Sequence, residues 1–190
     1  MTVAYNAHAP AEANAMASEP ARGLVIVNTG DGKGKTTAAL GMAMRAVGHG
    51  MHVAFVQFVK AAAVGEHEAA VRLAPELEIF QMGCGCVTGE PTDEDLRAAR
   101  EALETTRACL TGGRYAMVVA DEAITAVGLN LLDRDAVESL LADRPADVHL
   151  VLTGRGAWPS LTDRADLVTE MHSVKHPHET GGGALEGIEF

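Results

Sequence analysis

The sequence has few of the features that mark membrane, secreted or nucleic-acid-binding proteins. It carries 15 Lys and Arg against 26 Asp and Glu, a formal net charge of −11, which argues against a nucleic-acid polyanion as the main partner. No apolar run approaches the ~20 residues that cross a bilayer, and the first residues lack the charged-then-apolar order of a signal sequence. Three cysteines, an odd number, fit a reducing cytoplasm better than a disulfide framework. We therefore expect a soluble cytoplasmic protein with no membrane or nucleic-acid partner.

Apolar residues are plentiful enough for one core. The 190 residues are 47% hydrophobic, which suits a single domain. Residues 1–22 are Ala-rich, contain Pro10 and Pro20 and show no clear apolar period. We expect them to form a flexible arm, either a disordered tail or a segment that docks on a partner subunit. Residues 23–190 are expected to form the domain.

A strand, a glycine-rich loop and a helix follow the arm. The loop and the start of the helix read Thr29-Gly30-Asp31-Gly32-Lys33-Gly34-Lys35-Thr36-Thr37. Strand, glycine loop, Lys-Thr and helix are the layout of a phosphate-binding loop. Its backbone N–H groups and the helix N-terminus would bind an anion. Lys35 would contact phosphate oxygens, and the Thr36 hydroxyl would ligate Mg²⁺.

This loop is shorter than the usual G-x-x-x-x-G-K motif. Only Asp31, Gly32 and Lys33 separate Gly30 from Gly34, and Thr29 stands where the first glycine would be. A tighter loop encloses a smaller anion-binding nest of backbone N–H groups. We therefore expect the loop to bind a nucleoside triphosphate, but with a different phosphate in this nest than an ordinary ATPase places there. The alternative is a glycine-rich turn that binds no ligand.

Strand-like and helical segments alternate along the chain. Strands are expected at Leu24–Thr29, His52–Lys60, Leu77–Gln81, Tyr115–Ala120, His149–Leu152 and Leu167–Met171. Helices are expected at Lys35–Val47, Glu68–Ala74, from Thr92 to about Leu110, up to Gly128, from Asp133 to before Pro145, and at Pro159–Ala165. The alternation predicts an α/β three-layer sandwich with a mostly parallel sheet, of the phosphate-loop NTPase (RecA-like) type.

Right-handed crossovers place the carboxyl ends of the strands on one edge, where ligands bind. A strand ends there in Asp121 and Glu122, and one of these carboxylates would complete a Mg²⁺ site with Thr36; a surface turn is the alternative. Arg155 follows another strand between two glycines, so its guanidinium could reach phosphates.

Two other groups invite a metal interpretation that we reject. Cys84 and Cys86 have no second pair of ligands at the spacing that structural zinc needs, and we interpret them as small residues lining a ligand loop. His176 and His178 lie in a Pro-interrupted tail with no third ligand evident.

These motifs occur in the order and spacing of the bacterial ATP:corrinoid adenosyltransferases, which the sequence resembles from about Gly23 to its C-terminus. The resemblance is carried by Thr29–Thr37, Ala43–Gly50, Val56–Lys60, Asp121-Glu122, Thr153–Gly156, Val174–Pro177 and Gly187–Phe190. It implies transfer of the 5′-deoxyadenosyl group of ATP to a Co(I) corrinoid, with triphosphate released intact. It also implies that ATP is turned round, so that the γ-phosphate occupies the nest usually given to the β-phosphate.

The resemblance further implies roles for individual residues. Lys35 and Arg155 are the expected catalytic residues, because they would stabilise the departing triphosphate. ATP would be bound by the loop Thr29–Thr37 with Arg45, Lys60, Glu66 and Arg155. Mg²⁺ would be held by Thr36, Asp121 and Glu122. The corrinoid would contact Met82, Cys84, Cys86, Val87 and Thr88. A homodimer is implied, and an electron donor of the flavoprotein or flavodoxin-like kind is expected.

One loop departs from the family pattern. Enterobacterial relatives carry a Phe and a Trp there, which displace the lower axial ligand of the corrinoid, whereas Cys86 and Thr88 stand at those positions here. Either Met82 and Val87 supply the apolar wedge, or the enzyme favours a corrinoid whose lower ligand is already absent. Two other functions remain as alternatives: a phosphate-loop small-molecule kinase or ATPase, and a non-catalytic nucleotide- or corrinoid-binding regulator.

Overall fold

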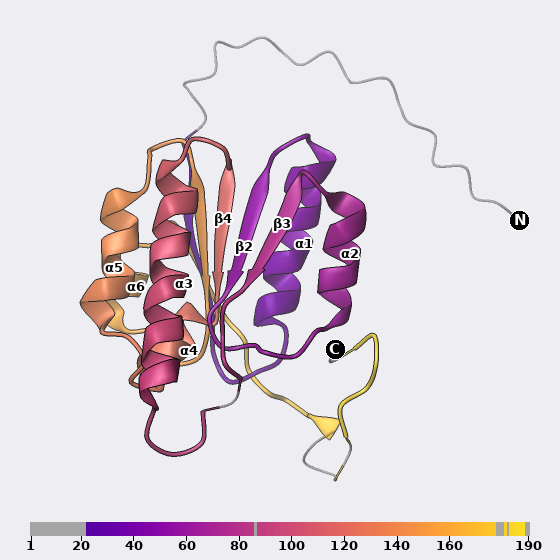
Figure 1. Cartoon of the computed structure of the whole chain (residues 1–190), viewed down its shortest axis with the longest axis vertical. Coiled ribbons are helices and arrows are strands. Elements are labelled where there is room, and N and C mark those ends of the chain that lie inside the picture. The colour runs from indigo at the N-terminus through magenta and orange to yellow at the C-terminus, as the bar shows by residue number, and fades with distance from the viewer. Residues whose placement is uncertain (1–21, 86, 178–180, 182, 189–190) are drawn as a thin grey trace, which may run out of the picture.

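A computed structural model describes residues 22–85, 87–177, 181 and 183–188. Figure 1 shows a sheet with helices on both sides and the C-terminal segment passing beneath the carboxyl ends of the strands. All but one residue of the arm expected at 1–22, and Cys86 of the expected corrinoid loop, lie outside the described residues.

The sheet of the described chain has six strands. They are β1 (Val25–Thr29), β2 (Val53–Gln57), β3 (Leu77–Gln81), β4 (Met117–Asp121), β5 (His149–Thr153) and β6 (Leu167–Glu170). Their order across the sheet is β3-β2-β4-β5-β1-β6, and every pairing is parallel. All carboxyl ends therefore reach one edge, and the predicted α/β sandwich with a parallel sheet is confirmed.

Helices cover both faces of this sheet. They are α1 (Lys35–Gly48), α2 (Gly65–Leu73), α3 (Asp93–Thr111), α4 (Ala123–Gly128), α5 (Arg134–Asp143) and α6 (Pro159–Thr162). α1 and α2 lie on one face, and α3 to α6 lie on the other (Figure 1). The predicted element bounds differ from the observed ones by three residues or fewer.

Two of these differences concern the site. The second strand ends at Gln57 rather than Lys60, because the Val59 carbonyl accepts from Gly85 N–H and Lys60 is already in a loop. The second helix begins at Gly65 rather than Glu68, because the His67 side chain accepts the backbone N–H of Val64 at 3.1 Å and caps the helix.

The core has two parts, one on each face of the sheet. On the α1/α2 face, small residues of α1 let the helix approach the strands closely: Ala39, Ala43 and Ala46 pack near Phe55 and Val119. The opposite face buries larger side chains from the strands and from α3 to α6. Strands covered on both faces need continuous apolar runs, which explains the strongly apolar strand segments seen in the sequence.

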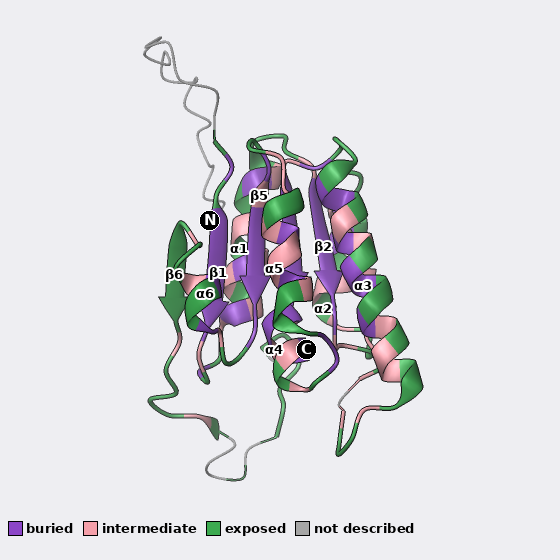
Figure 2. Ribbon diagram, turned by 90° about the vertical axis from the view of Figure 1, so that its left-hand side faces the viewer, coloured by how far each residue is buried: buried purple, intermediate pink, exposed green. Residues whose placement is uncertain are grey.

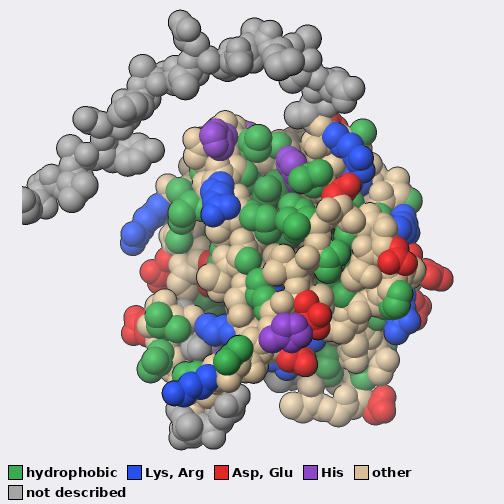
Figure 3. All heavy atoms as spheres, turned by 180° about the vertical axis from the view of Figure 1, so that it is seen from behind, with side chains coloured by type: hydrophobic (Ala, Val, Ile, Leu, Met, Phe, Trp, Pro, Cys, Tyr) green, Lys and Arg blue, Asp and Glu red, His purple; other side chains and the backbone are tan. Residues whose placement is uncertain are grey.

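The edge strand β6 is unlike the others, because all four of its residues are exposed. Figure 2 shows it standing uncovered beside β1. Figure 3, which views the molecule from this side, shows hydrophobic side chains gathered here, and the exposed apolar residues of this edge are Leu24, Leu167 and Val168. Hydrogen bonds hold β6 in place: the Asp166 carboxylate accepts the Val25 N–H at 2.8 Å and pairs with Arg22 at 2.8 Å.

No helix in the described part of the chain is long and apolar enough to cross a membrane.

Candidate nucleotide-binding and active site

A row of buried polar side chains marks the carboxyl ends of the four central strands. Asn28, Gln57, Asp121 and Thr153 are each 3% exposed or less. Side chains alternate between the faces of a strand, and each of these lies two residues after a core residue of the α1/α2 face. The row therefore faces α1 and α2. Polar groups in such a position need partners, and these partners build the site.

The phosphate-binding loop joins β1 to α1. Gly30 and Gly34 have φ angles of 94° and 121°, which favour glycine. The Lys35 ammonium donates to the carbonyl oxygens of Gly30 and Gly32, at 2.7 and 2.8 Å. Burial lowers the pKa of Lys35; the nearby Arg155 lowers it further, while Glu122 opposes the shift. A polyanion bound here would relieve this unfavourable environment, so the loop is prepared for phosphate.

The C-terminal segment lies directly against this loop. The Met171 N–H donates to the Thr29 carbonyl at 2.8 Å, and the Gly32 N–H donates to the Met171 carbonyl at 2.7 Å. A Cβ at Gly30 would lie 2.4 Å from the Met171 oxygen, and a Cβ at Gly32 would lie 2.7 Å from the His172 carbonyl carbon. Gly30 and Gly32 therefore have to be glycine because the segment after β6 packs against them, whether or not a ligand is bound.

Asp121 joins the loop to the end of β4. Its Oδ1 accepts the Thr36 hydroxyl at 2.9 Å and the Thr153 hydroxyl at 2.8 Å. Its Oδ2 is buried without a hydrogen-bond partner; the Lys60 ammonium lies 3.8 Å away. Burial raises the pKa of the Asp121 carboxyl, although Lys60 and the two hydroxyl groups oppose the shift. The oxygen without a partner is suited to a cation.

The donor set fits Mg²⁺. A threonine hydroxyl and carboxylate oxygens are the hard ligands that this ion prefers, with water and substrate phosphates completing its octahedron. The described residues contain no group of three or more His, Cys, Asp or Glu side chains able to hold a metal. Thr36 and Asp121 would therefore hold Mg²⁺ together with phosphate oxygens rather than alone.

Glu122 and Arg155 are set by tight backbone geometry. Glu122 has a φ of 64°, and its N–H donates to the Thr153 hydroxyl at 2.9 Å. Arg155 N–H donates to the Thr125 hydroxyl at 3.0 Å, and a Cβ at Gly154 would lie 2.4 Å from the Thr125 nitrogen. α4 and the loop after β5 are thus locked together, and both side chains line the same cavity.

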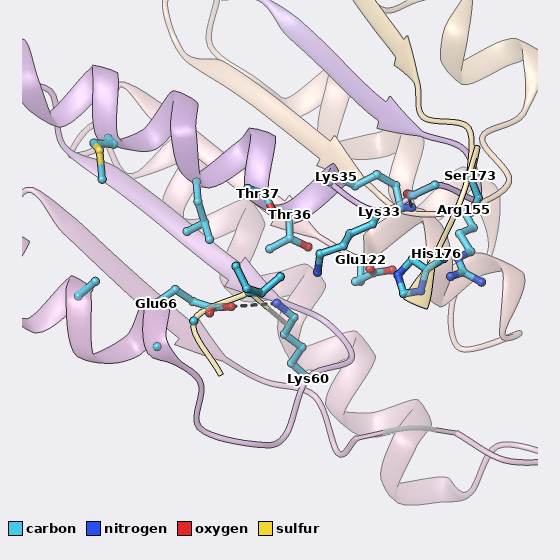
Figure 4. Close-up of a pocket in the computed structure, with 18 of the residues that line it drawn as sticks. Lys33, Lys35, Thr36, Thr37, Lys60, Glu66, Glu122, Arg155, Ser173 and His176 are labelled. Carbon is cyan, nitrogen blue, oxygen red and sulfur yellow. Dashed lines mark hydrogen bonds and ion pairs between the residues drawn. The ribbon is translucent and has the colours of Figure 1, made fainter. Parts of the chain in front are cut away.

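This cavity has a volume of about 860 Å³. Figure 4 shows Lys33, Lys35 and Thr36 on one side of it, Lys60 below them, and Glu122, Arg155 and His176 next to one another. Although the chain as a whole is acidic, four cationic side chains of the described residues line it: Lys33, Lys35, Lys60 and Arg155. An apolar wall continues along α1 and α2: Leu40, Met44, Ala69 and Leu73.

Most of the residues predicted to bind ATP gather here. The cavity is lined by residues 31–37 of the loop, Lys60, Glu66, Glu122 and Arg155, while Asp121 lies buried behind Thr36. Arg45 is in the last turn of α1 and is not among the described residues that line the cavity. Its role in ATP binding remains a prediction.

The predicted corrinoid loop is elsewhere. Met82 and Val87 pack against the core on the α3 face, while Cys84 and Thr88 are exposed. None of these four lines the 860 Å³ cavity, so the corrinoid contacts also remain predictions.

Sequence reasoning missed several residues of the site. Ser173 and His176 of the C-terminal segment line the cavity; the segment around His176 contributed to the family resemblance and was rejected as a metal site, but neither residue was predicted to bind ATP. His67, which contacts the buried Gln57 amide at 2.7 Å, gave no signal, because nothing in a single sequence shows that α2 packs over the end of β2.

Comparison with known proteins shows the family of the chain. Residues 21–190 match the family described as ATP:corrinoid adenosyltransferase BtuR/CobO/CobP. The chain belongs to this family. A corrinoid adenosyltransferase of Pseudomonas aeruginosa is 42% identical over 172 residues, 89% of this chain and 84% of that protein. One from Escherichia coli K12 is 35% identical over 180 residues, 94% and 91% of the two chains.

A similar relative is corrinoid adenosyltransferase CobA of Salmonella typhimurium, 36% identical over 180 residues, 94% of this chain and 91% of that protein. Among solved structures, the flagellar accessory protein FlaH of Methanocaldococcus jannaschii matches with a TM-score of 0.55 and 9% identity, covering 79% of this chain and 71% of the other. That likeness shows the fold alone. The family assignment makes ATP and a corrinoid the substrates, and the predicted adenosyltransferase activity is confirmed at that level.

Proposed function

We propose that this chain transfers the 5′-deoxyadenosyl group of ATP to the Co(I) centre of a reduced corrinoid and releases triphosphate. In this step the cobalt electron pair forms the Co–C bond to the 5′-carbon. The C5′–O5′ bond breaks, and its electrons leave with the triphosphate oxygen. No proton needs to move, so no general base is needed. The observation that carries the proposal is that one cavity brings the phosphate-binding loop, with its two lysines, together with Lys60 and Arg155 from other parts of the chain.

The work of the protein would be placement and charge stabilisation. Loop N–H groups and Lys35 would hold the triphosphate end of ATP, and Arg155 would face the charge that develops as the C–O bond breaks. Thr36, Asp121 and Glu122 would hold Mg²⁺, which neutralises phosphate charge. The short loop supports the reversed binding of ATP, with the γ-phosphate in the nest and the sugar carbon outward.

Further proposals concern the partners. Met82, Cys84, Val87 and Thr88, with Cys86, would contact the corrinoid. We also propose that a flavoprotein or flavodoxin-like donor reduces Co(II), that the protein works in the cytoplasm, and that it is a homodimer. The resemblance to the family implies the donor and the dimer, whereas the odd number of cysteines is the reason to expect the cytoplasm. Light scattering on the full chain should give twice the chain mass of 19.8 kDa; a monomer at working concentration would refute the dimer.

One anaerobic assay tests the reaction. Protein, MgATP and a chemically reduced corrinoid are mixed, and the light-sensitive Co–C bond is followed by absorbance while the phosphate product is identified. We expect the Co–C bond and free triphosphate. ADP as product would establish the kinase or ATPase alternative, and binding without any product would establish the regulator.

Variants connect the assay to the cavity. Lys35→Ala should lower turnover by roughly 10²- to 10³-fold, the range for loss of one donor that stabilises a developing anion. The matched control is Arg100→Ala, which also removes one positive charge, from an exposed position on α3. Near-normal turnover in Lys35→Ala would remove the loop from the mechanism.

A further inference from the structure

A chain of polar contacts runs from α2 to the buried carboxylate of Asp121. His67 Nε2 lies 2.7 Å from the amide oxygen of Gln57. The Gln57 amide nitrogen donates to Glu66 Oε1 at 3.2 Å, and the Lys60 ammonium donates to the same oxygen at 2.9 Å. Lys60 is in turn 3.8 Å from the unpartnered Oδ2 of Asp121.

The backbone determines which group is the donor in the contact between His67 and Gln57. The Val64 N–H donates to His67 Nδ1 at 3.1 Å, so Nδ1 is the acceptor nitrogen of a neutral ring and Nε2 carries the hydrogen. His67 therefore donates to the Gln57 oxygen, which leaves the Gln57 nitrogen to face Glu66. Because Gln57 is fully buried, its amide has no water with which to exchange these partners.

Lys60 lies between two carboxylates. Glu66 binds it at hydrogen-bond distance, whereas the Asp121 oxygen is beyond that distance. Figure 4 shows the Lys60 side chain reaching into the cavity while held by Glu66. If Glu66 were free to turn, the flexible Lys60 stem could pair directly with Asp121 and compete with a cation for Oδ2.

We propose that His67 is a positioning residue for Lys60. Through Gln57 and Glu66, it holds the Lys60 ammonium away from Asp121, so that the ammonium remains available to phosphate and the Asp121 oxygen to Mg²⁺. This inference rests on the proposed function, in which Lys60 contacts the triphosphate. Burial favours the neutral form of Glu66, but hydrogen bonds from Lys60 and from the backbone outweigh it and lower the pKa of this carboxyl group. Glu66 therefore holds Lys60 as an anion.

Two variants of His67 separate positioning from helix capping. In His67→Asn the amide lies where Nδ1 was, so it can still accept the Val64 N–H but does not reach Gln57. In His67→Gln the amide lies where Nε2 was, so it can still donate to Gln57. A purely structural role of His67 at the start of α2 predicts that the Asn variant behaves better; a positioning role predicts that the Gln variant does.

The measurement is calorimetric binding of ATP to the full chain, with Mg²⁺ and with EDTA. We expect His67→Asn to weaken MgATP binding about fivefold, the equivalent of a net hydrogen bond of ~1 kcal/mol, and to lose affinity mainly when Mg²⁺ is present. His67→Gln should bind like the wild type, and a cooperative thermal melt should show that both variants remain folded, each with a lower Tm because it loses one of the two hydrogen bonds of His67. Wild-type MgATP affinity in His67→Asn, or an equal loss in His67→Gln, would overturn the proposal.

A double-mutant cycle with Lys60→Ala shows whether the effect passes through Lys60. We expect His67→Asn to add nothing in the Lys60→Ala background; the same fivefold loss there would overturn the proposal. Should His67→Asn fail to fold, Glu66→Gln takes its place in the cycle with the same expected result. If Lys35→Ala and Lys60→Ala both bind MgATP normally, the proposed function itself is at fault. If they are impaired while His67→Asn is normal, only this inference fails.

Discussion

At the scale of single residues, the Asp121 carboxyl group of the site lies in an unfavourable environment. Its carboxylate is wholly buried, and one of its oxygens has no hydrogen-bond partner. Burying a charge without full compensation costs free energy, so the unliganded fold is less stable for carrying it. Such a cost is expected where a group serves binding rather than folding.

The pH dependence of stability should reveal this cost. Burial raises the pKa of Asp121 above its ordinary value of 3.8. The folded state then binds more protons than the unfolded state between these two pKa values, so this group makes the free energy of unfolding fall as pH rises through that window. We expect Asp121→Asn to lose that decline and to be more stable than the wild type at neutral pH without nucleotide.

Urea denaturation of wild type and Asp121→Asn measures the difference in their free energies of unfolding. A range of about pH 4 to pH 8 starts near the ordinary pKa of Asp and ends above that of His. The same variant should bind MgATP at least about tenfold more weakly, the lower end for loss of a group that supports a metal site. Parallel stability curves for wild type and variant would show that Asp121 carries no such cost.

At the scale of the element, the loop and the segment after β6 form one unit. Gly32→Ala should force the His172 backbone away, since its Cβ would lie 2.7 Å from a backbone carbon. We expect a loss of about 1–3 kcal/mol in stability, as for other forced overpacking, together with weaker MgATP binding. Thermal melting and calorimetry measure the two effects.

Gly41→Ala is the matched control, in the same region but at an exposed position of α1 where a Cβ meets nothing within 4 Å. It should stabilise the protein by about 1 kcal/mol, because alanine favours a helix interior, and should leave MgATP affinity unchanged. A Gly32→Ala variant that melts and binds like the wild type would show that the segment is free to move.

The elements also show which features of the fold can be predicted from the sequence. The strand that ends at Thr29, the glycine loop and the helix that begins at Lys35 were predictable, because their signals are local in the sequence. The order of the strands and the contact of Met171 with the loop were not predictable. They join residues far apart in the chain, and no local propensity encodes which distant segments meet.

At the scale of the whole molecule, the melting temperature should report nucleotide binding. Ligand at about 100 times its dissociation constant stabilises the native state by about 2.7 kcal/mol. For a chain of this size that corresponds to a rise in Tm of roughly 5–10 °C. MgATP should produce it in the wild type and not in Lys35→Ala, as followed by circular dichroism; an equal rise in both would place the nucleotide away from the loop.

The residues predicted to bind ATP and those predicted to bind the corrinoid lie in different parts of the fold, and their roles in binding stay predictions. Residues 31–37, Lys60, Glu66, Glu122 and Arg155 were anticipated and do meet at one cavity. The corrinoid loop was not located with them, since Met82 and Val87 are occupied in core packing on the other face. Motifs specify the chemistry of a ligand end such as triphosphate, whereas a large planar substrate is recognised by shape, which a single sequence does not reveal.

The two ends of the described chain leave the fold at opposite edges of the sheet. Arg22 is tied to Asp166, where β6 begins, whereas Ile188 lines the cavity at the other edge. Affinity tags or fusion partners are therefore not interchangeable in this enzyme. One that continues the chain beyond Ile188 starts from the wall of the cavity, whereas one that precedes Arg22 starts from the opposite ends of the strands. Kinetic constants measured with the first design would describe the tag as much as the protein.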